Sequence, residues 1–413
     1  MDGLEVLSTR GRRLIENRPM PAYADAHTER IADRYHPEQN PDGYLGLCVA
    51  ENKLVWDLLA PRFRAPRDLP AASLDYDDMI GNQEFRGRLS RFMGRTFLGR
   101  TFDPSQIAVV AGAGSVLELL FGVIADTGDG VLVPTPSYPG FWMDLETRDE
   151  LTIVPVHTRS EDGFRLTAEL LDAALERAER PVKALLYTNP SNPLGTVASA
   201  DEIEMVVVWT RRHDLHLVVD EVYALSVFGD VEFVSAASLL PSLGDRVHVV
   251  WAFSKDLGVS GLRCGVLVSE NEAVIAGVDG LAYWAAVSGD TQFVLGELVD
   301  DAEWVDGYLD AMRVRLRESQ QTATAALERN RIPHLAGPAG FFLLVDLRGH
   351  LDEPTWEAED RLWGRLLTEA NVNLTPGSEC RIGEPGFMRL VFTTEPPAHV
   401  AVAIDRVGAV LNG

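Results

Sequence analysis

The feature that most restricts the fold of this chain is a series of short apolar runs that alternate with amphipathic helical patterns. The runs cover residues 107–110, 130–133, 183–187, 215–219 and 247–253. Nearly continuous apolar character is typical of strands buried on both faces of a largely parallel sheet. Between two of the runs, Ser199 and Glu202 have the spacing of a capping box ahead of a helical stripe. The alternation predicts an α/β fold with right-handed crossovers.

The periodic region leaves a flank on each side, which predicts three parts. We expect an irregular N-terminal segment at residues 1–64 that packs with the small domain, a large domain at 65–301, and a smaller α+β domain at 302–413. The last part contains a long helical pattern at 304–330 and strand-like runs at 340–346 and 387–392. With 413 residues, 46% of them hydrophobic, the chain is long enough to bury two cores.

Charge and cysteine usage exclude several classes of function. The chain has 37 basic and 62 acidic residues, a net charge of −25, which disfavours nucleic acid as a partner. Cys48, Cys264 and Cys380 lack the spacing of a disulfide framework or a zinc site, so we expect no metal centre. No apolar run approaches the ~20 residues of a membrane span, and the N-terminus lacks a signal-peptide core. We therefore expect a cytoplasmic protein without membrane contact.

Polar or glycine-rich segments follow four of the predicted strands, where open parallel sheets bind ligands. The first, residues 111–115 (AGAGS), opens a helix, so its backbone N–H groups are placed to hold a phosphate. The others are residues 188–196 (TNPSNPLGT), 220–223 (DEVY) and 254–263 (SKDLGVSGLR). Taken singly, each of the first three also has a structural explanation, namely close packing, an Asx-Pro turn or a surface acid.

Lys255 in the fourth segment gives the set its chemical meaning. A lysine at the end of a buried strand is costly to desolvate unless its charge is lowered or it is covalently engaged. Together the segments supply what pyridoxal 5′-phosphate needs: a lysine for the Schiff base, an acid for the pyridine nitrogen, a phenol and an amide for the ring hydroxyl, and a helix N-terminus with an arginine for the phosphate. The sequence therefore predicts a pyridoxal-phosphate site.

On these segments the chain resembles the class I/II aminotransferase superfamily of fold type I over nearly its whole length. Within that superfamily it is most similar to the 1-aminocyclopropane-1-carboxylate (ACC) synthases. The shared stretches are residues 50–52 (AEN), 134–136 (PTP), 138–141 (YPGF), 189–196 (NPSNPLGT), 254–258 (SKDLG), 376–378 (PGS) and 384–386 (EPG). The resemblance implies a large domain with a mainly parallel, seven-stranded sheet between helices, and a smaller α+β domain.

The resemblance also implies roles for individual residues. Lys255 resembles the lysine that binds the cofactor and removes the substrate α-proton, and Asp220 resembles the acid that keeps the pyridine nitrogen protonated. Asn192 and Tyr223 would bond the ring oxygen, and Tyr138 would stack on the ring. Lys255, Asp220 and Tyr223 are the expected catalytic residues. The phosphate would lie among Ala113, Gly114, Ser115, Ser254 and Arg263.

Two charged residues are expected to bind the substrate, alongside Asn192 and Tyr138. Arg389 resembles the arginine that grips the substrate α-carboxylate as a bidentate fork, although a solvated edge-strand charge is the alternative. Glu51 resembles a glutamate that lies beside the substrate in ACC synthases. A carboxylate there suits the sulfonium of S-adenosylmethionine (SAM), although a glutamate at the start of a helix is the alternative.

Several positions depart from the ACC synthase pattern around the expected substrate pocket. Met79 replaces a tyrosine, and Trp142 with Met143 replaces an Asp-Arg pair. Tyr76 instead occupies a place typical of aminotransferases, where a tyrosine reaches the phosphate of the neighbouring subunit. We therefore expect intact cofactor chemistry, a rebuilt substrate wall that includes Met79 and Trp142, and a homodimer with shared active sites in which Tyr76 acts in trans.

These features favour a pyridoxal-phosphate enzyme that cleaves the Cγ–S bond of SAM and releases methylthioadenosine, in specialised metabolism. Two outcomes stay open: ring closure to ACC, or γ-elimination or γ-replacement with capture of a vinylglycine-type intermediate by a second substrate. The main alternative is an aminotransferase that exchanges an amino group between an amino acid and a 2-oxo acid. A C–S lyase or a decarboxylase also fits the scaffold, whereas the intact cofactor residues disfavour an inactive regulator.

Overall fold

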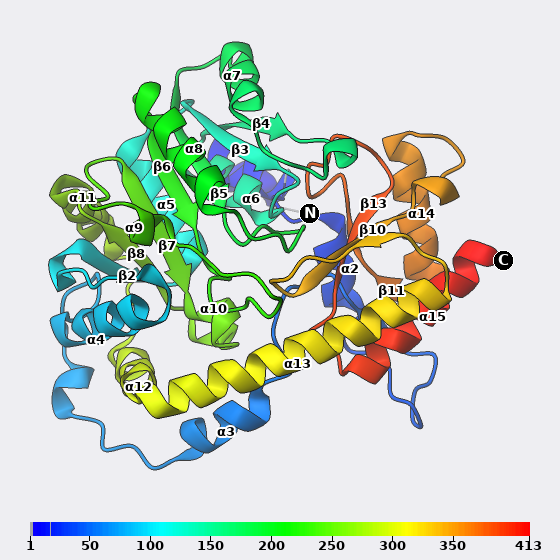
Figure 1. The fold of residues 1–413 in the computed structure, drawn as a ribbon, viewed down its shortest axis with the longest axis horizontal. Coiled ribbons are helices and arrows are strands. Elements are labelled where there is room, and N and C mark those ends of the chain that lie inside the picture. Colours follow the sequence, from blue (N-terminus) through cyan, green and yellow to red (C-terminus); the bar gives the residue numbers. More distant parts are fainter. Residues whose placement is uncertain (1–2, 17) are drawn as a thin grey trace.

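The computed structural model describes residues 3–16 and 18–413, and its centre is a seven-stranded sheet (Figure 1). The strand order is β2-β8-β7-β6-β5-β3-β4. Every neighbouring pair in this sheet is parallel except the two pairs that include β8. The strands are β2 (Ile107–Val110), β3 (Gly130–Thr135), β4 (Thr152–His157), β5 (Val182–Thr188), β6 (His216–Asp220), β7 (Val247–Ala252) and β8 (Gly265–Ser269). The predicted α/β fold is confirmed.

Helices cover both faces of this sheet, and each face has its own apolar core. One face packs against α5 (Ala113–Ile124), α6 (Gly140–Glu146) and α11 (Glu272–Ala282). The opposite face contributes to the larger core with α4 (Gln83–Met93), α7 (Ala168–Arg177), α8 (Ala200–Arg212) and α9 (Ala236–Leu239). All residues of β2, β7 and β8 are buried, because helices lie on both sides of them.

Ser199 caps α8 as predicted, since its side chain accepts the backbone N–H of Glu202. The reciprocal half of the predicted capping box is wrong. The Glu202 carboxylate instead accepts a hydrogen bond from the Tyr187 hydroxyl at 2.7 Å. A partly buried phenol competes for the glutamate, and a pairing of this kind is invisible to a local sequence pattern.

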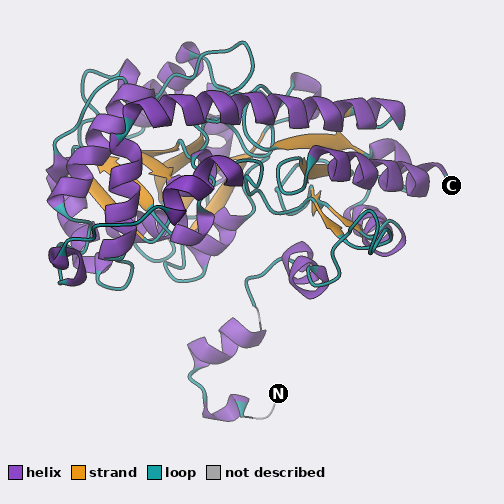
Figure 2. Ribbon diagram, turned by 90° about the horizontal axis from the view of Figure 1, so that it is seen from below, coloured by secondary structure: helices purple, strands orange, loops and turns teal. Residues whose placement is uncertain are grey.

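A second, four-stranded sheet has the order β12-β13-β10-β9 and is antiparallel throughout. Its strands are β9 (His334–Leu335), β10 (Phe342–Asp346), β12 (Thr375–Pro376) and β13 (Phe387–Val391). The helices α14 (Trp356–Glu369) and α15 (Pro397–Asn412) belong to the same part of the chain. The 28-residue α13 (Ala302–Arg329) runs the length of the molecule past both sheets (Figure 2), and the shorter α10 (Phe253–Asp256) and α12 (Gly289–Asp300) precede it.

The N-terminal segment is more regular than predicted. It contains α1 (Thr9–Glu16), α2 (Ala22–Arg30) and α3 (Trp56–Arg64), whose few apolar residues and prolines hid them from the sequence pattern. The short β1 (Leu45–Gly46) pairs in parallel with β11 (Val372–Asn373), beside α2 and α15. The predicted division at residues 64 and 301 stays a prediction.

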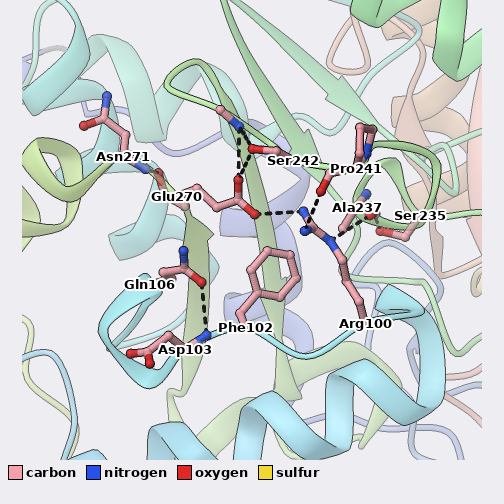
Figure 3. Close-up of polar contacts among 12 residues, drawn as sticks. Arg100, Phe102, Asp103, Gln106, Ser235, Ala237, Pro241, Ser242, Glu270 and Asn271 are labelled. Carbon is pink, nitrogen blue, oxygen red and sulfur yellow. Dashed lines mark hydrogen bonds and ion pairs between the residues drawn. The ribbon is translucent and has the colours of Figure 1, made fainter.

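An arginine clasp closes the edge of the large sheet where β8 ends (Figure 3). Arg100 donates to the carbonyl oxygens of Ala237 at 3.2 Å and Pro241 at 3.1 Å, and to the Glu270 carboxylate at 2.9 Å. Its guanidinium also lies over the Phe102 ring, 4.5 Å from the centroid. Because β8 is antiparallel, its last residue lies at the edge opposite the carboxyl ends of the parallel strands. Within the described ranges, no helix is long and apolar enough to cross a membrane.

Candidate active site

Two adjoining cavities lie at the carboxyl ends of the parallel strands, between the two sheets. The inner cavity measures about 300 Å³ and the outer one about 800 Å³, and both are lined by Val49, Tyr138, Met143 and Lys255. Ten of the predicted site residues line the inner cavity: Glu51, Ala113, Gly114, Tyr138, Asn192, Asp220, Tyr223, Ser254, Lys255 and Arg263. The structure therefore brings together, in one pocket, predicted site residues that lie up to 212 positions apart in the sequence.

Lys255 lies on α10, the single short turn that follows β7. Its Nζ donates to the Ala50 carbonyl oxygen at 2.7 Å. Burial, helped by the nearby charge of Arg389 and opposed by Glu51 and Asp220, lowers the pKa of Lys255 to about 8. A lysine amine with this pKa is neutral in a useful fraction of molecules near neutral pH, which is what a nucleophile or a base requires.

Asp220 ends β6 and is 5% exposed. Burial raises the pKa of its carboxyl to about 7, although the Val222 N–H, 3.2 Å from Oδ1, and the charge of Lys255 favour the ionised form. A buried acid that lacks a full cationic partner is suited to a protonated ring nitrogen.

The Tyr223 hydroxyl is buried and has no hydrogen-bond partner within the described part of the chain. Its ring is fixed edge-on by Phe341 and Phe342, with centroids 5.2 and 5.3 Å away. A buried phenol costs free energy unless it is bonded, so this orphaned group indicates that a ligand oxygen belongs beside it. The orphaned Tyr223 hydroxyl and the unpaired Asp220 carboxyl both fit pyridoxal phosphate.

The first turn of α5 and Arg263 form the cradle in which the sequence predicts the phosphate. Gly112 has φ +94°, and a Cβ there would collide with the guanidinium of Arg263, so only glycine lets the arginine lie against the turn. Arg263 itself is held by donation to the carbonyl oxygens of Ser260 at 3.1 Å and Ala111 at 3.3 Å. The backbone N–H groups at this helix start and the arginine are suited to a phosphate.

Arg389, on β13, is 2% exposed and lines the outer cavity. It donates to the Asn192 side-chain oxygen at 3.0 Å, the Thr375 hydroxyl at 3.0 Å and the Cys48 carbonyl oxygen at 2.7 Å. Its Nε has no partner among the described residues. A buried arginine with a free donor is suited to a carboxylate, and the alternative of a solvated edge charge is wrong because the side chain is buried.

Glu51 lies in the loop that precedes α3, and its carbonyl oxygen accepts the Thr393 hydroxyl at 2.6 Å. The side chain is 39% exposed and pairs with Lys53 at 3.3 Å. Because α3 begins only at Trp56, Glu51 does not lie in the first turn of a helix, and that alternative is wrong. Glu51 lines the inner cavity, and its negative charge raises the pKa of Lys255.

Trp142, predicted for the substrate wall, lines the outer cavity. The Arg381 guanidinium lies over the Trp142 indole, 5.0 Å from the ring centroid. Met143 lines both cavities. The wall that replaces the Asp-Arg pair of ACC synthases is therefore an aromatic surface stacked with a cation.

Three predicted residues line neither of the two cavities in the described chain. Tyr76 is 97% exposed, and Tyr76 and Met79 line a separate groove with Tyr283. Ser115 lies in the first turn of α5, where its hydroxyl donates to the Ala111 carbonyl oxygen at 3.2 Å. The roles assigned to these three residues stay predictions.

The structure adds residues that the sequence analysis missed. Tyr23 of α2 lines the outer cavity beside Arg389, and Thr188 and Ser260 line the inner one. Asp144 of α6 reaches the phosphate cradle, where a Cβ on Gly114 would lie 3.0 Å from its Oδ1. Burial raises the pKa of Asp144 to about 7, Glu118 adds to the shift and Arg263 opposes it. Asp144 directly follows the divergent pair at 142–143, which was the one available signal.

Comparison with known proteins agrees with this site. The family model for class I and II aminotransferases matches residues 66–407. The chain is 38% identical to 1-aminocyclopropane-1-carboxylate synthase 4 of Oryza sativa subsp. japonica, over 92% of this chain and 84% of that protein. It is 35% identical to 1-aminocyclopropane-1-carboxylate synthase of Nicotiana tabacum, over 95% and 83%.

Among solved structures, a double mutant of Thermus thermophilus aspartate aminotransferase has a TM-score of 0.81 at 22% identity, over 99% of this chain and 100% of that one. The aromatic aminotransferase of Pyrococcus horikoshii has a TM-score of 0.77 at 21% identity, over 93% and 98%. These likenesses bear on the fold alone. Because the family model spans most of the chain and the two synthases match almost all of it, the chain belongs to the class I and II aminotransferase family of pyridoxal-phosphate-dependent enzymes and lies close to the ACC synthases.

Proposed function

We propose that this enzyme acts on SAM, cleaves its Cγ–S bond and releases methylthioadenosine. The observation that carries the proposal is Glu51, which lines the inner cavity and whose negative charge lies close enough to Lys255 to raise its pKa. A carboxylate there stabilises a sulfonium and disfavours an anionic side chain. The similarity of the chain to two proteins named as ACC synthases supports the same substrate.

The outer cavity supports a large substrate. Its volume of about 800 Å³ lies in the range of pockets that hold drug-sized ligands, and it adjoins the amine of Lys255. A small dicarboxylic or aromatic amino acid would leave much of this space to water. The bulky adenosyl group of SAM would extend from the inner cavity toward Trp142.

Pyridoxal phosphate, when bound, supplies an electron sink that makes the α-carbon acidic. The residues of the chain would do the rest. Arg389 would hold the α-carboxylate, and Nζ of Lys255 would take the α-proton. Glu51 would lie beside the sulfonium, whose sulfur receives the electron pair of the broken Cγ–S bond and leaves as a neutral thioether.

The fate of the four-carbon fragment has two forms in this proposal. Attack of the α-carbon on Cγ closes the ring of ACC. Loss of a β-proton instead gives γ-elimination, or γ-replacement when a second substrate adds at Cγ. The rebuilt wall at Trp142 and Met143 gives room for a second reactant, so we keep both forms.

The test is incubation of the purified holoenzyme with SAM, followed by chromatography of the nucleoside and amino-acid products. Release of methylthioadenosine with ACC, or with 2-oxobutyrate and ammonia, would support the proposal. Amino exchange that depends on a 2-oxo acid, with SAM left intact, would support the aminotransferase instead. Lys255→Ala should abolish either activity, because both require this amine.

A second experiment isolates the role of Glu51. Glu51→Gln should weaken SAM binding about tenfold, equivalent to ~1.4 kcal/mol. S-adenosylhomocysteine is the control ligand, because it differs from SAM only in lacking the methyl group and the positive charge on sulfur. Its affinity should stay the same in the variant. Equal losses for both ligands would overturn the assignment of Glu51 to the sulfonium.

We also propose a homodimer with shared active sites. Tyr76, Tyr283 and Trp284 are 97%, 68% and 75% exposed, and large exposed aromatic side chains mark protein interfaces. Tyr76 and Tyr283 line one groove, so they form a continuous surface for a second copy.

A further inference from the structure

The residue that follows the catalytic lysine, Asp256, is fully buried and is bonded away from the active site. Its Oδ1 accepts the Ser226 hydroxyl at 2.6 Å. Its Oδ2 accepts the Trp251 indole N–H at 2.9 Å and the Leu225 backbone N–H at 3.0 Å. One carboxylate thus satisfies three donors in an environment from which water is excluded.

The three donors come from two segments of the chain. Trp251 belongs to β7, whereas Leu225 and Ser226 follow directly after Tyr223. Asp256 itself shares α10 with Lys255. Because Lys255 and Tyr223 both line the inner cavity, the Asp256 carboxylate fixes the backbone that carries the amine relative to the backbone that carries the phenol.

Helix α13 holds the same two segments from outside. The Tyr308 hydroxyl donates to the Asp256 carbonyl oxygen at 3.2 Å, and Arg313 Nε donates to the Leu225 carbonyl oxygen at 3.3 Å. Close to this contact, Gly258 has φ +67°, and a Cβ there would lie 2.8 Å from Val55 and 3.7 Å from the Tyr308 hydroxyl. The turn that carries Lys255 therefore packs against both α13 and the segment that follows Glu51.

We propose that Asp256 is a positioning residue: its carboxylate ties the helical turn of Lys255 to the turn of Tyr223, so that the amine and the phenol reach the cofactor in register. The effect is geometric. The charges that act on Lys255 are those of Arg389, Glu51, Asp220 and Arg263. This inference rests on the cofactor and does not depend on SAM as the substrate.

The test compares Asp256→Ala with Asp256→Asn, without any substrate. Alanine leaves three buried donors without an acceptor, whereas asparagine keeps an oxygen for Trp251 and Leu225 and donates to the Ser226 hydroxyl. Two readouts follow the position of the amine. One is the pH midpoint of the visible absorbance of the holoenzyme, and the other is the rate at which added pyridoxal phosphate attaches to the apoenzyme.

In Asp256→Ala we expect the midpoint to move by at least ~0.5 pH unit and attachment to slow about 10- to 100-fold, as for an ångström-scale misplacement. Asp256→Asn should restore most of both. If Asp256→Ala does not fold, Ser226→Ala, which removes one bond, should move both readouts in the same direction by a smaller amount.

Glu359→Ala is the matched control. Glu359 lies on α14 and is also fully buried. Its carboxylate accepts hydrogen bonds from the backbone N–H groups of Ser378 at 2.8 Å and Gly386 at 2.6 Å. The Glu359→Ala variant should have a lower thermal unfolding midpoint, while the pH midpoint of the absorbance and the rate of cofactor attachment stay at their wild-type values. A wild-type pH midpoint and attachment rate in folded Asp256→Ala, or in Ser226→Ala where that variant stands in, would overturn the proposal. So would equal shifts in Glu359→Ala.

Discussion

At the scale of single residues, the active site depends on ionisable groups whose pKa values are moved by burial toward the middle of the pH range. The pKa of Lys255 is lowered to about 8, and those of Asp220 and Asp144 are raised to about 7. In each case burial is the largest cause. The protonated ring nitrogen of the cofactor would supply Asp220 with the positive charge that it lacks.

The lowered pKa of Lys255 predicts how the apoenzyme takes up its cofactor. Only the neutral amine attacks the aldehyde. At pH 7, a pKa of about 8 leaves roughly 10% of the amine neutral, against about 0.03% for an ordinary lysine near 10.5. The rate of attachment should therefore rise with pH and level off above about 8. Stopped-flow absorbance between pH 6 and 10 measures this, and a rate that still climbs tenfold per pH unit above pH 9 would contradict it.

Sequence reasoning found the cofactor residues because each follows a buried strand or belongs to a recognisable motif. It missed Tyr23 and Asp144 for a physical reason. Tyr23 enters the site from α2, which packs beside β11 more than 300 residues later, and no local pattern records that contact. Asp144 is a helix residue whose burial depends on how α6 lies against α5.

At the scale of elements, the predicted strands match five of the seven in the large sheet. β4 and β8 were missed. β4 contains Pro155 and lies at the edge of the sheet, where a proline is tolerated but weakens the strand pattern. β8 begins at Gly265 directly after the cofactor loop, and its antiparallel direction breaks the strand–helix alternation on which the prediction relied.

The turn between β2 and α5 gives an element-scale prediction. Gly112→Ala places a Cβ against the Arg263 guanidinium, which must move from the phosphate cradle. We expect pyridoxal phosphate to bind at least about tenfold more weakly, a loss of ~1.4 kcal/mol or more. Fluorescence titration of the apoenzyme measures this.

The control for that variant is Gly128→Ala. Gly128 has φ +86° and nothing within 4 Å of an added Cβ, so alanine there strains the backbone in the same way without a collision. Its cofactor affinity should match that of the wild type. Equal losses in the two variants would show that strain, and not the displaced arginine, is responsible.

The arginine clasp at the opposite edge of the sheet gives the reverse prediction: its loss should lower stability and change cofactor affinity little. Arg100→Ala removes the bonds to Ala237, Pro241 and Glu270, and leaves the partly buried Glu270 without its cation. We expect a loss of roughly 1–3 kcal/mol in the free energy of unfolding. Cofactor affinity should change less than threefold, because the clasp lies away from the phosphate cradle. Denaturant unfolding and titration of the apoenzyme measure the two quantities.

At the scale of the whole molecule, the two sheets meet across the site, and a polar latch joins them at one side. The Ser160 N–H and hydroxyl, from the segment after β4, donate to the Glu384 carboxylate at 2.9 and 2.7 Å. Arg348 of the second sheet region pairs with the same carboxylate at 2.9 Å. Arg389 reaches the site from this region, so under its proposed role the separation of the two parts would govern how tightly a substrate carboxylate is held.

The proposed sharing of sites between two copies predicts complementation between inactive variants. Lys255→Ala lacks the amine, and Tyr76→Ala lacks the phenol that would act on the partner's phosphate. If Tyr76 acts in trans, a hybrid dimer contains one site with Lys255 from one copy and Tyr76 from the other, and a second site with neither. Random re-association of equal amounts should then give about one quarter of the wild-type number of intact sites.

The measurement is activity after the two variants are mixed in mild denaturant and refolded together, with each variant refolded alone as the control. Recovery toward one quarter of the wild-type activity supports a Tyr76 that reaches across the interface. If Tyr76 served its own chain, the copy with an intact lysine would still lack its phenol, and mixing would recover nothing. Sedimentation of the wild type as an active monomer would contradict the shared site directly, because the 97% exposed Tyr76 lines a groove that is separate from the two cavities of its own chain.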